Sequence, residues 1–457
     1  MRCADEGSHR RSWTVVWTDH DAAVAAGYRV DAQRWRVLFD DLILTIGQRF
    51  RRPEPRRRMR EFVRGLLAPL PRKNCWTIAE HAGDRTPDGM QHLLSRARWD
   101  AGGVRDDVRS YVVEQLGDPG AVLVVDETGD VKKGRATPGV QRQYTGTAGR
   151  TENAQVAVYL GYAAPRGHAL IDRELYLPKS WTGDPARCEA AGIPGHVAFA
   201  TKPQLARLMI ERAVSARVPF AWVAADEAYG DNGPLRTWLE QQHIAYVLAV
   251  ARDHRVPAGV GRTVRADELA ARLPGRAWQR LPAGDGAKGH RWYDWARVTI
   301  SNPGPGHRCL LIRRNRSTGE LAFYHCYSPQ RVTLAALVKV AGLRWTIEEN
   351  FQAGKGLTGL DEHQVRRWTS WYRWVTLAML GAAVLTIAAA IESARGPAAA
   401  GQIPLTRNEI AHLLAAVTVP PGRDAGHRLR WSHWRRRHQH RARTCHYQRQ
   451  ITQDHAT

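Results

Sequence analysis

The chain has 457 residues, enough for two or three domains and at least one sizeable core. Hydrophobic residues make up 43% and charged residues 24%, which excludes an intrinsically disordered chain. The 67 Lys and Arg exceed the 44 Asp and Glu and give a net charge of +23, which favours a partner rich in phosphates. A genome whose composition favours arginine is the alternative explanation.

Cysteine usage and hydropathy bear on the compartment. The six cysteines lie far apart and none forms a C-x-x-C pair, which argues against a zinc knuckle or a disulfide framework and suits a reducing cytoplasm. The first residues lack the apolar stretch of a signal peptide. The uncharged run Val375 to Ile391 is at the short limit for a membrane span, and we interpret it as a buried core helix. We therefore expect a cytoplasmic protein without a membrane partner.

Residues 31–118 have a helical pattern, whereas residues 1–30 match no pattern and are of uncertain order. Apolar residues recur at helical spacing in Arg34 to Phe50. Two short helices, Trp76 to Gly83 and Asp88 to Ala97, are separated by a tight break, in the outline of a helix-turn-helix. Many helical hairpins share that outline. We expect residues 31–118 to form an N-terminal helical DNA-binding domain, with phosphate contacts from the basic run that includes Arg56, Arg57 and Arg58.

The pattern changes to alternating strands and helices at about residue 119. Ala121 to Asp126 and Phe220 to Asp226 are short β-branched or apolar runs, typical of strands buried on both faces, and each ends on an aspartate. Three further strands and two helices are expected at 154–162, 169–176 and 245–250, and at 201–216 and 233–243. Strands that alternate with helices predict an α/β core whose first part is residues 119–251.

The remainder divides into three regions. The pattern of residues 252–331 predicts a β-rich insertion with strands at 297–301, 308–313 and 321–327. Helical pattern returns in residues 332–395, with breaks at Gly342 and around 354–359, and forms the second part of the core. Residues 396–457 hold a last helix, signalled by a capping box from Thr406 to Glu409, and a basic tail. Nine arginines follow Pro420, so the tail is either a clamp on DNA phosphates or a disordered basic end.

Carboxylates supply the chemical signal. A carboxylate at the mouth of a sheet is costly unless it is paired or ligates a metal, so Asp126 and Asp226 are candidate ligands; helix capping is the alternative for each. A third ligand is expected from a helix packed on the sheet. Arg344, Glu348 and Lys355 share one helical face, which would place a metal ligand between two cations suited to a phosphate. An ordinary exposed helix with an ion pair would show the same spacing.

Several stretches together resemble the DDE transposases of bacterial insertion sequences, and most closely the insertion sequence 701 family within the broader insertion sequence 4 group. The stretches span roughly residues 30–440 and are Val124-Val-Asp-Glu-Thr-Gly-Asp-Val-Lys-Lys-Gly134, Gln143-Tyr-Thr-Gly146, Leu175-Tyr-Leu-Pro-Lys-Ser-Trp181, Ala225-Asp-Glu-Ala-Tyr-Gly230 and Arg344-x-x-x-Glu348-x-x-x-x-x-x-Lys355. The resemblance implies an RNase H-like catalytic core, interrupted by the β-rich insertion.

The resemblance also implies a catalytic, metal-binding triad of Asp126, Asp226 and Glu348, and it selects Glu348 over Glu349. The site would hold two Mg²⁺ ions, for which Mn²⁺ would substitute. The broader group has a Tyr three residues before the Arg, where this chain has Ala341. Glu127 and Asp130 could support Asp126. Candidate DNA contacts near the triad are Arg344, Lys355, Lys132 and Lys133.

Aromatic residues are frequent, with 17 Trp in the chain. Trp292 and Trp295 in the insertion are candidates for stacking on an unpaired base, although core packing is the commoner role of such residues. The leading hypothesis is a transposase that binds terminal inverted repeats, cuts DNA and joins the 3′ ends to target DNA, as a homodimer on double-stranded DNA. The alternatives are a catalytically idle DNA-binding protein or repressor, and a general RNase H-like nuclease.

Overall fold

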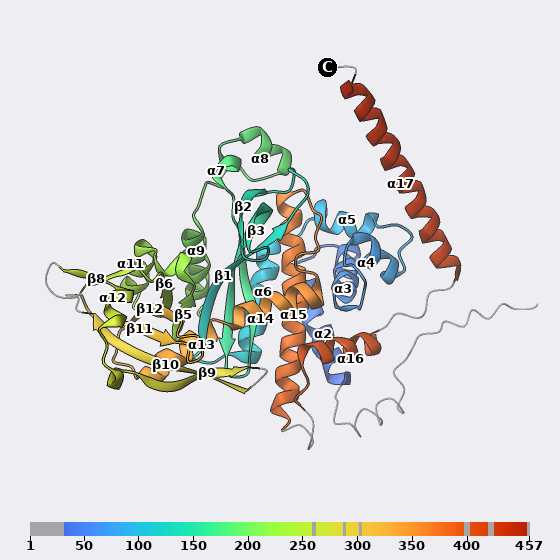
Figure 1. Ribbon diagram of the computed structural model, residues 1–457. Helices are drawn as coiled ribbons and strands as arrows, with labels where there is room; N and C mark the ends of the chain where they lie inside the picture. Colours follow the sequence, from blue (N-terminus) through green and yellow to red (C-terminus); the bar gives the residue numbers. More distant parts are fainter. Residues whose placement is uncertain are drawn as a thin grey trace, which may run out of the picture.

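The computed structural model describes residues 32–257, 262–286, 289–300, 304–396, 403–418 and 425–454 (Figure 1). Residues 1–30, whose order the sequence leaves uncertain, lie outside these ranges. Within the described residues ten strands form one mixed sheet, in the order β2-β3-β1-β5-β6-β12-β11-β10-β9, with β4 paired to β3. The chain is therefore an α/β protein with a large central sheet, as the sequence predicts.

One half of the sheet carries both predicted aspartate strands. β1 is antiparallel to β3 and parallel to β5, and β5 is parallel to β6. This order fits the RNase H-like core implied by the resemblance. The strands of this half are β1 (Val122–Val131), β2 (Gln141–Thr145), β3 (Arg150–Ala164), β4 (Gly167–Leu175), β5 (Trp222–Ala225) and β6 (Ala245–Val250).

The strands of residues 252–331 extend the same sheet. β12 pairs antiparallel with β6, and β11, β10 and β9 follow outward. The expected strand at 297–301 is the last part of a longer β10. These strands are β9 (Gln279–Gly286), β10 (Gly289–Ile300), β11 (His307–Arg314) and β12 (Leu321–Ser328), with a separate pair β7 (Arg255–Pro257) and β8 (Thr263–Arg265) and the helix α12 (Ala266–Ala271) beside them.

The prediction that the first buried strand ends on Asp126 is wrong. β1 continues to Val131 and stays paired with β3 as far as the Val131 and Ala154 partners. Residues 122–125 are buried on both faces, whereas beyond Asp126 most residues are only partly buried and Val131 is exposed. The apolar run therefore marks only the doubly buried part of the strand, and Asp126 lies in its middle.

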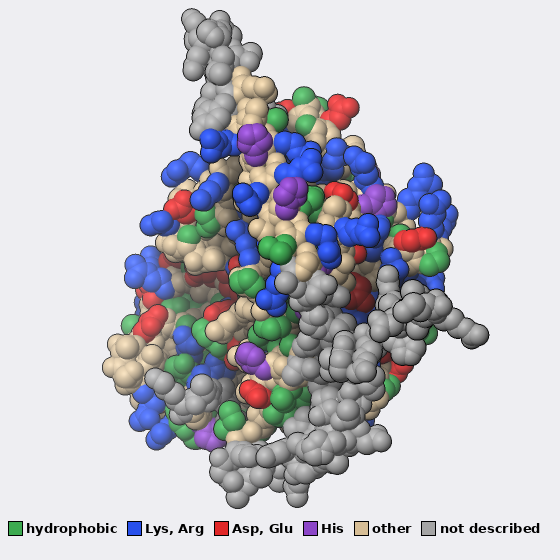
Figure 2. Space-filling model, turned by 90° about the vertical axis from the view of Figure 1, so that its right-hand side faces the viewer, with side chains coloured by type: hydrophobic (Ala, Val, Ile, Leu, Met, Phe, Trp, Pro, Cys, Tyr) green, Lys and Arg blue, Asp and Glu red, His purple; other side chains and the backbone are tan. Residues whose placement is uncertain are grey.

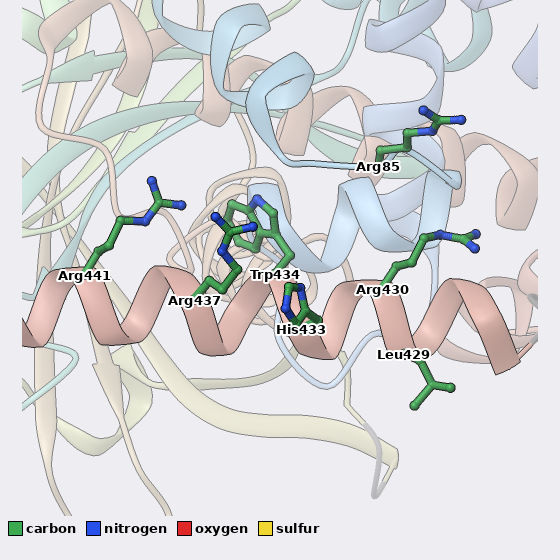
Figure 3. A pocket seen from close by; sticks show the side chains of 7 residues that line it. All are labelled: Arg85, Leu429, Arg430, His433, Trp434, Arg437 and Arg441. Carbon is green, nitrogen blue, oxygen red and sulfur yellow. The ribbon is translucent and has the colours of Figure 1, made fainter.

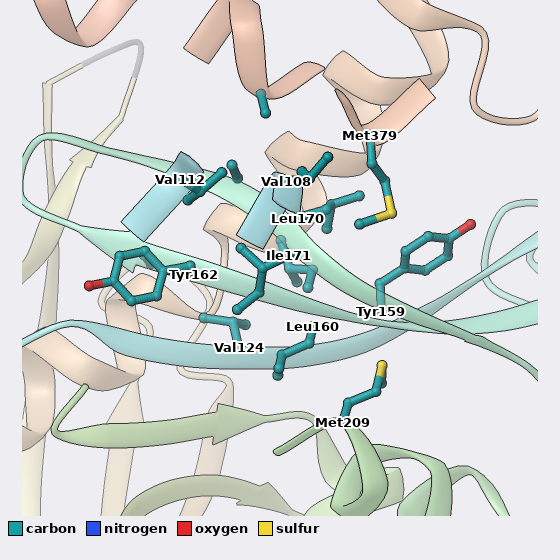
Figure 4. Packing of buried hydrophobic residues seen from close by; sticks show 14 of the residues in the cluster. Val108, Val112, Val124, Tyr159, Leu160, Tyr162, Leu170, Ile171, Met209 and Met379 are labelled. Atoms are coloured by element: carbon teal, nitrogen blue, oxygen red, sulfur yellow. The ribbon is translucent and has the colours of Figure 1, made fainter. Parts of the chain in front are cut away.

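Helices cover both faces of the β1, β3 and β4 region. Figure 4 shows Val108 and Val112 of one helix on one side of these strands, with Met379 beside them, and Met209 on the other. One face is covered by α6 (Ala101–Leu116), α13 (Leu334–Leu343), α14 (Thr346–Thr358) and α15 (Trp368–Ala394), and the other by α9 (Lys202–Ser215). α11 (Gly233–Gln241) packs on α9 and β6, and short α7 (Lys179–Thr182), α8 (Pro185–Ala191) and α10 (Glu227–Gly230) complete this part.

The helix break predicted around residues 354–359 is confirmed, whereas the break predicted at Gly342 lies two residues further on. α13 and α14 are separated at Arg344 and Trp345, and α14 runs to Thr358 before Gly359, whose φ of +63° ends it. Gly342 lies inside α13, where a Cβ would come 1.9 Å from the carbonyl oxygen of Ala283. This glycine therefore serves the close approach of helix and strand β9, and it does not break the helix.

α15 contains the uncharged run and passes through the centre of the molecule (Figure 1). It is the one helix of the described residues that is long and apolar enough to span a membrane, but 89% of its most apolar window is buried inside the protein. It packs against α3, α6 and β4. The prediction of a buried core helix is confirmed.

The N-terminal helices form as predicted, and they pack on α15. The hydrophobic core of the sheet is continuous with Trp35, Phe62 and Ile78 of these helices. They are α2 (Ala32–Gly47), α3 (Pro53–Leu67), α4 (Cys75–Ala82) and α5 (Asp88–Ser95). α4 begins at Asn74, which accepts the N–H groups of Trp76 and Thr77, and ends at left-handed Gly83.

The C-terminal region is helical. α16 (Arg407–Thr418) packs on α2 and α15, and α17 (Ala425–Asp454) projects past α4 and α5 as a single long helix (Figure 1). The basic tail is therefore helical along its described length, which does not fit the alternative of a disordered end for residues 425–454. The five cysteines within the described residues are free thiols.

Candidate active site

Asp126 and Asp226 lie side by side on neighbouring parallel strands. Val125 of β1 is in register with Ala225 of β5. Asp126 directly follows Val125 in the chain, and Asp226 directly follows Ala225. Asp226 also caps α10 by accepting the N–H of Ala228 at 3.0 Å. Both interpretations of Asp226, helix cap and site residue, are therefore compatible, because the cap occupies one of its two oxygens.

The two aspartates resist ionisation. Burial, with the nearby charges of Asp226 and Glu127, raises the pKa of Asp126 to about 8. Burial and the charge of Glu127 raise the pKa of Asp226 to about 6. A cationic ligand between such carboxylates would relieve both the burial cost and the mutual repulsion.

Glu348 is joined to Asp126 by Arg344. The Arg344 Nη1 atom lies 3.7 Å from Oδ2 of Asp126, and Nη2 lies 3.4 Å from Oε1 of Glu348. Asp126 faces this helix because it is opposite Tyr159 in the β3 pairing, and Tyr159 contacts Phe351 of α14 edge to face. The helical face predicted from the Arg, Glu and Lys spacing is thus turned toward β1.

The neighbouring Glu349 points elsewhere. Its Oε2 atom lies 3.0 Å from Nε2 of His168 on β4, and Arg407 of α16 donates to its backbone oxygen at 3.4 Å. The hydrogen bond from His168 lowers the pKa of Glu349. The geometry therefore supports Glu348 as the member of the candidate site and gives Glu349 a structural role.

Glu127 faces the opposite side of β1 from Asp126, as alternation along a strand requires. Its carboxylate accepts from Lys202 of α9 at 2.5 Å and from the hydroxyl of Tyr229 at 2.6 Å. Sequence reasoning did not assign Lys202 or Tyr229 to the site, although Tyr229 stands in the Asp226 motif. Their contacts fix Glu127 next to the aspartates.

Asp130 lies on the same face of β1 as Asp126 and holds two cations and a histidine. His363 Nε2 lies 3.0 Å from Oδ2 of Asp130, and the Nζ atoms of Lys355 and Lys132 both lie at 3.9 Å. Burial opposes ionisation, but the hydrogen bond and charge of His363 and the two lysines lower the pKa of Asp130. Asp130 therefore remains a carboxylate, and no sequence signal singles out its partner His363, which lies in the loop after α14.

The chemistry of these carboxylates suits divalent metal ions, but their positions in this conformation do not form a complete metal site. Asp126 and Asp226 offer paired, desolvated oxygens of the type that Mg²⁺ prefers. Among the described residues no three His, Cys, Asp or Glu side chains are clustered closely enough to form a ready-made metal site. Glu348 would become the third ligand if its side chain rotated away from Arg344. That rotation is open to it because the side chain is 38% exposed.

The other predicted DNA contacts are scattered. Arg57 and Lys133 are exposed, whereas Lys132 is held by the backbone oxygen of His363 at 3.1 Å. Arg56 donates to the backbone oxygen of Phe50 at 3.1 Å from an exposed position. Arg58 lies against Gly89 of α5.

The two tryptophans proposed to stack on a base differ in exposure. Trp292 is 42% exposed, with Arg280 over its ring at 5.0 Å. Trp295 is 1% exposed and donates to the backbone oxygen of Leu281 at 3.2 Å, so its proposed contact with a base is wrong for this conformation. The two residues are three positions apart in a regularly paired part of β10, so their side chains point to opposite faces of the sheet.

Ala341, which replaces the Tyr of the broader group, is buried at 8% exposure in α13. A contact with a phosphate from this position is therefore absent in this chain. Among the described residues, cations near the aspartates of the site include Arg344, Lys202 and, along β1, Lys355 and Lys132.

Comparison with known proteins gives concordant matches. A family model described as DDE superfamily endonuclease matches residues 46–301, more than half of the chain, which includes Asp126 and Asp226 and ends before α14. The probable transposase for insertion sequence element IS701 of Microchaete diplosiphon is 30% identical over 198 residues, covering 42% of this chain and 48% of that protein. The chain thus spans about half the length of this curated relative.

Two solved structures give weaker likenesses. A piggyBac transposase synaptic complex with hairpin DNA aligns at 13% identity and a TM-score of 0.41, over 81% of this chain and 73% of that chain. The NurA nuclease from Sulfolobus solfataricus aligns at 9% identity and a TM-score of 0.25, over 53% of this chain and 80% of that chain. At these scores neither likeness establishes a shared fold.

Proposed function

The chain belongs to the DDE superfamily endonucleases, and from that premise we propose that it is a transposase that binds terminal inverted repeats, cleaves DNA and joins the freed 3′ ends to target DNA. The observation that carries the proposal is the register of β1 and β5, which sets Asp126 beside Asp226 with Arg344 linking Asp126 to Glu348. The net charge of +23 supports a DNA partner.

Asp126 and Asp226 would hold two divalent ions, Mg²⁺ or in its place Mn²⁺, with Glu348 as the third ligand. When bound, such ions neutralise charge on the phosphate and activate the attacking oxygen. Arg344 would then release Asp126 and Glu348 and bind the substrate phosphate. Its guanidinium group thus keeps an anionic partner before and after substrate binding. Cleavage by water and joining by a 3′-hydroxyl are both in-line displacements at phosphorus, so one set of residues serves both.

The remaining residues hold the site in shape. Lys202 and Tyr229 fix Glu127 on the far face of β1, so that its charge stays near the aspartates without entering their face of the sheet. Because the two ends of an element must be brought together, we infer that the working form is a homodimer on DNA, acting in the bacterial cytoplasm at the nucleoid.

The direct test is Mg²⁺-dependent nicking of a labelled duplex carrying the element's terminal repeat, by the wild type and by Asp126→Ala. We expect nicking by the wild type alone, with equal DNA binding by both. Binding of the repeat without any nicking by the wild type would instead favour the idle DNA-binding protein or repressor. Normal cutting by both Asp226→Asn and Glu348→Gln would overturn the triad.

A further inference from the structure

The long helix α17 is fixed to the N-terminal helices by aromatic side chains. Trp431 is 1% exposed, and its indole N–H donates to the backbone oxygen of Asp84 at 2.9 Å. Trp434 packs edge to face on Trp76 of α4, with ring centroids 4.9 Å apart. Arg435 also pairs with Glu80. These contacts hold one face of α17 against α4 and leave an adjacent face uncovered.

That adjacent face forms a groove with the loop after α4. The groove has a volume of about 430 Å³, and Arg85 of the loop lies across it from Arg430, Arg437 and Arg441 of the helix. Figure 3 shows the three helix arginines projecting from the side of α17 that faces Arg85, with Trp434 and His433 between them. Positions 430, 437 and 441 share a face because they are separated by seven and four residues.

The cations of the groove face no acidic side chain of the described residues. Its lining contains no acidic side chain, and in the part of the chain that the structure describes none of its four arginines forms an ion pair. Elsewhere the protein neutralises such clusters, since Asp172 lies 2.9 Å from both Arg105 and Arg212. Figure 2 shows Lys, Arg and His side chains gathered over the upper part of this face of the molecule.

We propose that the groove between α17 and Arg85 binds the sugar-phosphate backbone of double-stranded DNA, at a site separate from the carboxylates of β1 and β5. The proposal rests on DNA being the substrate. Arg430 to Arg441 spans about 16 Å of helix, and a duplex carries one charge for each ~1.7 Å of its axis, so the stripe meets several phosphates. A second α17 would bring like charges together, and an apolar partner would have to desolvate four guanidinium groups.

Binding to the groove is independent of base sequence, since guanidinium groups that meet phosphates carry no sequence information. The groove therefore adds affinity and orientation, and recognition of the terminal repeat belongs to another surface. This predicts equal loss of affinity for repeat and non-repeat duplexes when groove arginines are removed, and a reduced salt dependence.

The experiment compares two double variants of the full chain that differ only in the face of α17 they alter. Arg430→Gln with Arg437→Gln removes two charges from the groove, and Arg428→Gln with Arg436→Gln removes two exposed charges at nearly the same heights but on other faces. Affinity for a duplex of arbitrary sequence is measured without divalent metal across a range of salt concentrations. Thermal unfolding of both variants checks that the helix remains in place.

We expect the groove variant to bind about tenfold more weakly near physiological salt, with a slope of log affinity against log salt smaller by about two, while the control changes less than about threefold. Equal losses in the two variants, or none in the groove variant, would overturn the proposal. Loss of affinity for duplex RNA but not for DNA would also overturn it.

Mg²⁺-dependent nicking by the same proteins separates this proposal from the proposed function. If the wild type nicks DNA and the groove variant keeps full affinity, the groove assignment fails and the endonuclease assignment stands. If the wild type nicks nothing but the groove variant loses duplex affinity, the groove assignment stands and the endonuclease assignment fails.

Discussion

The Nζ atom of Lys355 lies 3.9 Å from Oδ1 of Asp130, four residues along β1 from Asp126. Four strand residues span about 13 Å, and the seven residues from Glu348 to Lys355 span about 10.5 Å of helix. Arg344, just before α14, lies near Asp126, and Lys355 of α14 lies near Asp130 together with Lys132. The spacing of Glu348 and Lys355 on α14 is thus close to the spacing of two aspartates on one face of the strand.

The first prediction concerns Asp130 as a positioning residue for Lys355. Replacing Asp130 by Asn removes the charge that holds Lys355, so we expect kcat for nicking to fall on the order of ten- to a hundredfold while DNA affinity stays nearly unchanged. Glu152→Gln, which breaks a surface pair with Arg150, is the control. An unchanged kcat for Asp130→Asn, together with a large loss for Lys355→Met, would show that Lys355 needs no such partner.

The adjacent pair Glu348 and Glu349 gives a second prediction. Glu348→Gln should lower nicking at least a thousandfold and leave stability nearly unchanged, because the side chain is part-exposed and its partner Arg344 keeps Asp126. Glu349→Gln should keep nicking but lower the free energy of unfolding by about 1 kcal/mol, since it weakens a bond from His168. Nicking rates and chemical denaturation of both variants test this prediction. Loss of nicking in Glu349→Gln but not in Glu348→Gln would make Glu349 the third ligand.

The sequence predicts the paired aspartates well, for a physical reason. Strands buried on both faces are continuous apolar runs, so Asp126 and Asp226 stand out where the runs stop. The same rule misplaces the end of β1, because its second half is only partly buried. His363 is invisible to such reasoning, since its bond to Asp130 joins residues 233 positions apart. Contacts of that kind depend on tertiary packing, which no local pattern records.

A third prediction follows from Asp126, whose pKa is raised from 3.8 to about 8 by burial and neighbouring charge. Between pH 4 and 8 the folded protein keeps a proton that the unfolded chain has released, so this residue makes stability fall as the pH rises. Asp126→Asn removes that dependence. Without divalent metal, its Tm should exceed that of the wild type by roughly 2–6 °C at pH 8 and by much less at pH 5.

Thermal unfolding at several pH values measures this gain, with Asp40→Asn as the control because Asp40 pairs with Arg60 at the surface. A gain of the same size at pH 5 and pH 8 would contradict the raised pKa of Asp126. A loss of stability at pH 8 would show that the carboxylate is needed for the fold.

The buried carboxylate of Asp172 supports a fourth prediction. Asp172 is fully buried and accepts from Arg105 and Arg212, each at 2.9 Å, and burial is outweighed by these arginines, which lower its pKa. Asp172→Asn leaves the buried guanidinium groups without a carboxylate partner and should lower the free energy of unfolding by about 3–5 kcal/mol. Glu211→Gln, which breaks the exposed pair with Arg207, should cost about 0.5 kcal/mol or less.

Denaturation at neutral pH compares the two variants. The lowered pKa of Asp172 means that its stabilising effect is present above about pH 4 and is lost as the pH falls further. A cost for Asp172→Asn as small as that for Glu211→Gln would show that water or backbone groups already satisfy the arginines.

The last prediction separates two tryptophans of β10 that the sequence treats alike. Trp292→Ala removes an exposed ring and should leave stability within about 0.5 kcal/mol of the wild type, whereas Trp295→Ala empties a buried site and should cost about 3–5 kcal/mol. If Trp292 stacks on an unpaired base, its loss should weaken binding of a duplex with one unpaired base by about 1–3 kcal/mol and leave a perfect duplex unaffected. Trp292→Phe keeps an aromatic face and should restore most of that affinity. An affinity of Trp292→Ala for the duplex with the unpaired base that equals that of the wild type would reduce Trp292 to a surface partner of Arg280, the guanidinium that covers its ring at 5.0 Å.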